Sequence, residues 1–146
     1  MKRLAAAVLI SSLVGAAAAQ DSEKELKKLE GTYKVKALKK DGMDAPKEVM
    51  DSVKGVEIRG DKLIIKVMGE DKTAKIKVDP TKKPAQIDIT PEDKPEENKT
   101  LPGIYSLEKD ELTIVFAEGG DRPKDFKADG EKTLKMVLTR KGQDDK

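Results

Sequence analysis

The sequence has no cysteine, no histidine and no tryptophan, and its 146 residues include only two tyrosines and two phenylalanines. Because cysteine is absent, no disulfide can support the fold, and stability has to come from packing. Zinc sites built on Cys or His, thiol nucleophiles and Ser–His relays are excluded as well. Only carboxylates and lysines remain for chemistry, and no position suggests a catalytic pair. We therefore expect no enzymatic activity, no metal and no cofactor.

Residues 1–19 have the pattern of a secretory signal peptide. Lys2 and Arg3 precede a run of apolar or small residues that reaches to about residue 15, and Ala17, Ala18 and Ala19 stand directly before Gln20. That arrangement is typical of an export signal with a small-residue cleavage site. The apolar run is short for a membrane anchor, and no stop-transfer pattern follows it. We therefore expect an exported protein, periplasmic or secreted, with no membrane span.

Charges of both signs are abundant and nearly balanced. The full chain has 30 basic and 28 acidic residues, and removal of Lys2 and Arg3 with the signal would leave 28 of each. The two signs alternate finely along the chain, and only three arginines lie outside the signal. Recognition of nucleic acid requires clustered cations and stacking aromatics, both of which are scarce. The sequence therefore argues against a nucleic-acid partner.

The chain after the signal begins with helical patterns and then changes to strands. Residues 20–30 predict a short helix that Gly31 can end. Tyr33, Val35 and Ala37 then alternate with polar residues, as expected of the inner face of a strand. A second short helix is expected between Pro46 at its start and Gly55 past its end. Its inner face is expected to comprise Val49, Met50 and Val53.

The rest of the chain up to residue 141 alternates apolar and polar residues in short runs separated by turns. With the first strand, these runs predict eight strands: 31–38, 56–58, 62–68, 73–79, 85–90, 101–107, 111–117 and 132–140. Short connections favour an antiparallel up-and-down β-barrel over an open sandwich, because closure removes exposed edges. We therefore expect a barrel domain at residues 31–141 and a polar tail at 142–146.

Several stretches resemble one family. The segments LKKLEGTYKV, VDPTKKPAQIDIT, GIYSLEKDELTIVFA, GGDRPKDF and LTRK are similar, in order and spacing, to an uncharacterised lipocalin-like domain family abundant among exported proteins of planctomycete bacteria. The resemblance covers residues 26–141. It implies a lipocalin-like barrel and no established activity.

The resemblance also implies how the barrel closes. Lipocalins have a Gly-x-Trp motif at the first strand, with a basic side chain from the last strand lying on the indole. The matching positions here are Gly31, Tyr33 and Arg140, with tyrosine in place of tryptophan. Tyr33 and Arg140 both fall on the inner phase of their strands, so the guanidinium is expected to cover the phenol ring.

The loop AEGGDRPKDF at residues 117–126 has two interpretations. In one, Arg122 receives an anionic group and Phe126 is a platform for a ligand. In the other, which we favour, the glycines form a turn and Phe126 is a stopper over the mouth of the barrel. Tyr105 and Phe116, on the inner phase of their strands, complete the candidate ligand-binding residues.

Two functions remain open, and they differ in what fills the barrel. Small and medium apolar side chains line the expected interior, which leaves room for a small apolar ligand without requiring one. The alternative is a cell-envelope interaction module with a filled core that acts through outward apolar residues. Those residues are Ile64, Met68, Ile104, Val115 and Val137. The oligomeric state stays open, with a monomer as the simpler expectation.

Overall fold

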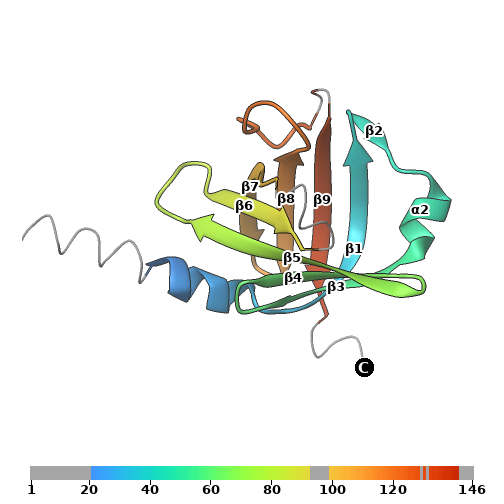
Figure 1. The fold of residues 1–146 in the computed structure, drawn as a ribbon, viewed down its shortest axis with the longest axis horizontal. Coiled ribbons are helices and arrows are strands. Elements are labelled where there is room, and N and C mark those ends of the chain that lie inside the picture. Colours follow the sequence, from blue (N-terminus) through green and yellow to red (C-terminus); the bar gives the residue numbers. More distant parts are fainter. Residues whose placement is uncertain (1–20, 93–98, 129, 131, 142–146) are drawn as a thin grey trace, which may run out of the picture.

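The computed structural model describes residues 21–92, 99–128, 130 and 132–141. The expected signal peptide at 1–19 and the polar tail at 142–146 lie outside the described residues. A helix covers residues 21–29. The elements that follow it are β1 (Gly31–Lys40), β2 (Met43–Asp44), α2 (Lys47–Ser52), β3 (Val53–Arg59), β4 (Lys62–Val67), β5 (Glu70–Asp79), β6 (Gln86–Pro91), β7 (Leu101–Glu108), β8 (Glu111–Ala117) and β9 (Thr133–Arg140) (Figure 1).

The strands form a closed antiparallel barrel. Each strand from β3 to β8 pairs with the next one along the chain, and β1 pairs with both β3 and β9. Among the described strands, β1 and β3–β9 therefore make an eight-stranded wall, and β2 is a two-residue hairpin partner at the end of β1. The predicted up-and-down barrel is confirmed, and its architecture matches a lipocalin-like barrel. Closure pairs both edges that an open sheet would expose.

The inner face of β1 changes partway along the strand. Tyr33 and Val35 face the core as predicted, but the pairing with β9 shifts between Val35 and Ala37. The extra residue of this β-bulge reverses the phase, so Leu38 packs against the core instead of Ala37. The predicted inward position of Ala37 is wrong, because strict alternation carries no information about an inserted residue.

Helix α2 is shorter and more exposed than the sequence predicts. It begins after Pro46 as expected, but it ends at Ser52, and Val53 and Gly55 belong to β3. None of its residues is buried, and Val49 is 43% exposed. The predicted inner face is therefore wrong. Val53, the last residue of the expected helix face, instead belongs to β3 and pairs with Val67 of β4.

The helix at 21–29 covers one end of the barrel. Leu29 is buried in the main core cluster and Leu26 packs against it. The Ser22 hydroxyl donates to the carbonyl of Val78, near the end of β5, at 2.9 Å. We call this the helix-covered end. Figure 1 shows the helix, in blue, on the opposite side of the molecule from α2. The open end is formed by the last residues of β1, β4, β6 and β8 and the first residues of β3, β5, β7 and β9.

A second, smaller apolar cluster lies on the outside of the wall. Ile104 of β7 and Val115 of β8 are buried, and Ala128 and Phe126 pack against them. We call residues 118–128 the cover loop, because they shield these two outward side chains. Ile104 and Val115 face outward as expected, but the cover loop buries them, so they are not available for the surface interaction that the alternative function would use. Phe126 covers the wall rather than the mouth, in contrast to the expected stopper.

Candidate functional site

A pocket of about 410 Å³ lies at the open end of the barrel. Residues of strands β4 to β8 line it. The inward side chains near the ends of these strands are apolar, and they do not fill the centre of the barrel at this end. Its apolar walls are formed by Leu63, Ile65, Ala74, Ile89, Pro91, Leu101 and Phe116. We call this cavity the open-end pocket. Several of its wall residues also belong to the main core, so the pocket is a continuation of the barrel interior.

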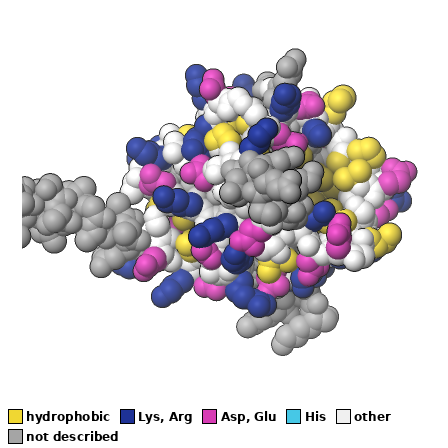
Figure 2. Space-filling model, in the orientation of Figure 1, with side chains coloured by type: hydrophobic (Ala, Val, Ile, Leu, Met, Phe, Trp, Pro, Cys, Tyr) yellow, Lys and Arg dark blue, Asp and Glu magenta, His cyan; other side chains and the backbone are white. Residues whose placement is uncertain are grey.

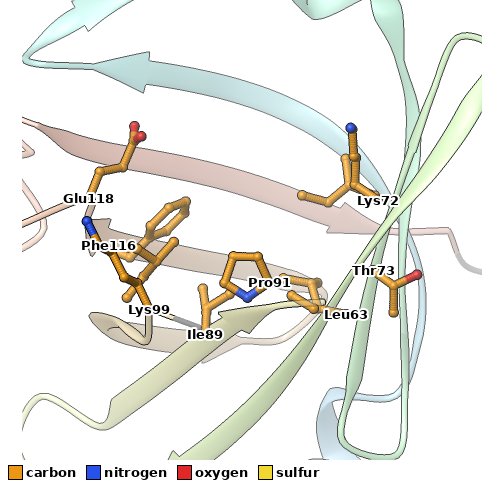
Figure 3. Close-up of a pocket in the computed structure, with 11 residues that line it drawn as sticks. Leu63, Lys72, Thr73, Ile89, Pro91, Lys99, Phe116 and Glu118 are labelled. Atoms are coloured by element: carbon orange, nitrogen blue, oxygen red, sulfur yellow. The ribbon is translucent and has the colours of Figure 1, made fainter. Parts of the chain in front are cut away.

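The rim of the open-end pocket is polar and carries charges of both signs. Lys99, Glu118 and Phe116 lie on one side, and Lys72 and Thr73 lie on the other (Figure 3). Glu118 forms an ion pair with Lys40 at 3.6 Å, and Lys72 forms one with Glu70 at 3.0 Å. Lys99 has no ion pair within the described part of the chain. The site thus combines an apolar interior with a charged opening.

The candidate ligand residues Phe116 and Tyr105 occupy different places. Phe116 lines the open-end pocket, whereas Tyr105 lies near the helix-covered end. The Tyr105 hydroxyl donates to Glu25 Oε2 of the helix at 2.7 Å. Burial, together with this hydrogen bond to a carboxylate, raises the pKa of Tyr105 above the ordinary 10.0. The neutral phenol thus fastens the helix to β7.

Phe126 and Tyr105 line a different hollow, beside the helix at 21–29. Both line a space of about 410 Å³ that also involves Glu25 and Lys28 of the helix. A further hollow, of about 620 Å³, lies between Leu26 and the side of β5. Charged residues alternate with apolar ones in its lining, including Lys75 and Asp88. Neither hollow offers the continuous apolar wall that the open-end pocket has.

Arg122 is held on the barrel wall by three hydrogen bonds. Its Nη1 donates to the carbonyls of Ile87 at 3.2 Å and Gly103 at 2.8 Å, which are paired residues of β6 and β7. Its Nη2 forms a salt bridge with Asp88 at 2.7 Å. The neighbouring Pro102 of β7 has no backbone N–H to donate. Arg122 thus joins two strands and fixes the cover loop, and its donors are not directed into the open-end pocket.

Gly31, Tyr33 and Arg140 lie together at the helix-covered end. The Arg140 guanidinium carbon lies 5.4 Å from the centre of the Tyr33 ring, and Nη2 donates to the Tyr33 hydroxyl at 2.9 Å. That hydroxyl donates in turn to the carbonyl of Leu29 at 2.6 Å. Gly31 has φ +147, and a Cβ there would lie 3.4 Å from Arg140 Nε. This arrangement closes one end of the barrel, and the open-end pocket lies at the other.

The rim residues Lys72, Thr73, Lys99 and Glu118 were missed by reasoning from the sequence. They resemble ordinary solvated charges at strand ends, and their positions around one opening follow only from barrel closure. The apolar walls were accessible, since Leu63, Ile65 and Ile89 lie on the predicted inner phase. The alternation of apolar and polar residues therefore indicates which side chains line the barrel interior, but it does not indicate which part of the interior is left unfilled.

Among the described residues, no group of three or more acidic side chains is placed to hold a metal ion. No described helix is long and apolar enough to cross a membrane. Comparison with family models, curated proteins and solved structures gave no match to the chain.

Proposed function

We propose that the protein is an exported, non-enzymatic, lipocalin-like binding protein that holds a small apolar molecule in the open-end pocket. The observation that carries this proposal is the asymmetry of the barrel interior. One end is filled by Leu29, Tyr33 and their neighbours, while the other leaves about 410 Å³ between apolar walls. Ligand pockets commonly have volumes of about 300–1,000 Å³ and are mostly apolar.

The walls of the pocket favour a ligand over a filled core. An eight-stranded barrel is either filled by its side chains or holds one small ligand. Ala74 occupies an inward position where a larger side chain would fill the space, and Phe116 borders the same space. Apolar surface left facing an open cavity is unfavourable, and an apolar guest that displaces water from it would be stabilised.

The export part of the proposal depends on the sequence of residues 1–19, and the non-enzymatic part on the missing cysteine and histidine. The resemblance to a lipocalin-like domain family supports the barrel scaffold and implies no established activity. Because the chain has no cysteine, a carrier of this kind needs a scaffold that is stable without disulfides, and continuous strand pairing around the barrel supplies one.

A second candidate function is a cell-envelope interaction module that acts through its surface. Exposed apolar side chains favour it: Met43 is 70% exposed and Met68 is 67% exposed, and Val49 of α2 adds to them. Figure 2 shows hydrophobic side chains, in yellow, on the side of the molecule that carries α2. Burial of Ile104 and Val115 beneath the cover loop removes part of the surface that this candidate would use.

The test is native mass spectrometry of the protein purified gently from the exported fraction of its own cells. We expect a discrete added mass that is lost on denaturation and that identifies the guest. Ala74→Leu, which fills the pocket, should abolish the added mass. Ala45→Leu adds the same bulk outside the pocket lining and should retain it. A bare-chain mass that persists after incubation with a lipid extract would favour the interaction module instead.

A further inference from the structure

We infer that the guest of the open-end pocket is an amphiphile with an anionic head group, and that Lys99 binds this head. The inference rests on the proposed function and specifies its ligand class. It follows from the arrangement of the pocket, whose walls are apolar while its polar groups are confined to the opening. A molecule that matches this arrangement has an apolar tail inside and a polar head at the rim.

The sign of the head group follows from the charges around the opening. Lys72 and Lys99 both line the pocket, and Glu118 is the single acidic residue among the described lining residues. Glu118 already has Lys40 as a counter-ion at 3.6 Å. A cationic head would therefore approach an opening whose acid already has a counter-ion, and Lys99 would repel it. An anionic head gains attraction from the same lysine.

Lys99 is better placed than Lys72 to receive the head group. Lys72 is paired with Glu70 at 3.0 Å, so an anion would compete with an existing partner. Lys99 has no ion pair among the described residues, and it lies on the side of the pocket where Phe116 and Glu118 lie (Figure 3). A tail packed against Phe116 would therefore bring its head group within reach of the Lys99 ammonium.

The experiment compares three probes with the same tail: lauric acid, lauryl alcohol and laurylamine, each titrated calorimetrically into full-length mature protein freed of bound lipid. We expect lauric acid to bind about three- to tenfold more tightly than the alcohol, as a charge-assisted contact at a partly exposed rim provides. The amine should bind more weakly than the alcohol. Raising the ionic strength should reduce the preference for the acid, because salt screens exposed charges.

Two variants locate the head group. Lys99→Gln keeps the length of the side chain but removes its charge, and it should abolish the preference for acid over alcohol without changing affinity for the alcohol. Lys82→Gln removes the same charge from the turn after β5, at the helix-covered end, and it should leave the preference intact. Both positions are exposed, so neither substitution is expected to disturb folding.

The possible outcomes separate the inference from the proposed function. If lauric acid and lauryl alcohol bind equally and Ala74→Leu abolishes both, the proposed ligand binding in the pocket holds, and the inference of an anionic head group is overturned. If the amine binds most tightly, Glu118 is the head-group partner and the inference is again overturned. If none of the three probes binds, both the inference and the proposed ligand function fail. Unequal binding that survives Lys99→Gln would overturn the assignment to Lys99.

Discussion

The Arg140 guanidinium lies over the ring of Tyr33 and also donates a hydrogen bond to its hydroxyl, so it contacts both the ring and the hydroxyl of one side chain. The two residues belong to β1 and β9 and face each other in the register that closes the barrel. The Tyr33 hydroxyl continues the chain of contacts to Leu29 at the end of the helix. Strand closure and helix attachment are therefore coupled through this pair.

The coupling should be measurable with a double-mutant cycle. We expect Tyr33→Ala to lower the free energy of unfolding by about 3–5 kcal/mol, as loss of a buried aromatic ring does. Arg140→Ala should cost about 1–3 kcal/mol, and the pair should show a coupling of about 0.5–2 kcal/mol. Chemical denaturation of the four proteins provides the measurement. The exposed pair Lys36–Glu111, at 3.5 Å, is the control and should couple by less than about 0.5 kcal/mol.

Simple additivity at Tyr33 and Arg140 would show that the contact does not stabilise the barrel. Lost helix attachment should appear in the same experiments as faster proteolysis within residues 21–29, because Arg140 also donates to the carbonyl of Lys28.

Gly103 should not tolerate a side chain. A Cβ at this position would lie 2.6 Å from the carbonyl oxygen of Val115 and 2.9 Å from Phe116 Cβ, so the backbone of β8 would have to move. We expect Gly103→Ala to lower the unfolding free energy by about 1–3 kcal/mol, measured by thermal or chemical denaturation. Gly119→Ala is the control: its nearest neighbour would be Lys132 Cδ at 3.7 Å, an ordinary contact. Equal stability of the two variants would contradict the close approach of β7 and β8.

Loss of the Arg122 guanidinium should release the cover loop. Arg122→Met keeps an unbranched side chain but removes the donors to Ile87, Gly103 and Asp88. We expect a cost of about 1–3 kcal/mol, faster proteolysis within residues 118–128, and stronger binding of a hydrophobic dye as Ile104 and Val115 become accessible. Lys124→Met in the same loop is the control and should behave as the unmodified protein. An Arg122→Met protein with unchanged proteolysis would show that apolar packing alone holds the loop.

Tyr105 should make the protein sensitive to alkaline pH. Its pKa is raised in the folded state by burial and by the hydrogen bond to Glu25, whereas an unfolded tyrosine loses its proton near pH 10. Above that pH the unfolded chain binds fewer protons than the folded one, so stability falls as pH rises. The contribution of the neutral phenol is complete below about pH 10 and is lost as the pH rises towards the folded pKa. Unfolding free energies measured across this range should decline less steeply in Tyr105→Phe, and equal slopes would contradict the prediction.

The sequence predicts the barrel well because each wall strand carries its own evidence of burial on one face. Ala74, Ile76 and Val78 alternate with lysines, and all three are buried in β5. Alternation of this kind specifies which face turns inward, and short turns leave antiparallel neighbours as the simplest pairing. The pattern is local, so it fails where one extra residue is inserted, as at the bulge before Ala37.

The cover loop shows a second limit of reading the sequence by alternation. In β7 and β8, Ile104 and Tyr105 are both buried, as are Val115 and Phe116, so the wall is buried on both faces there. Consecutive apolar residues in a strand are typical of a sheet covered on both sides. That signal was present in the run TIVFA, but only the tertiary structure identifies Phe126 and Ala128 as the residues that cover it.

The pairing of β1 with β9 has a consequence for how the chain folds. Tyr33 and Arg140 are separated by 107 positions, so their contact closes nearly the whole length of the domain. Contacts of this separation carry a large loop-closure entropy and slow the folding of β proteins relative to helical ones. The barrel cannot close until its last strand has been synthesised, and truncation within β9 would leave both β1 and β8 with an unpaired edge. Unpaired strand edges favour aggregation, so the pairing of β9 with both neighbours protects the edges of β1 and β8.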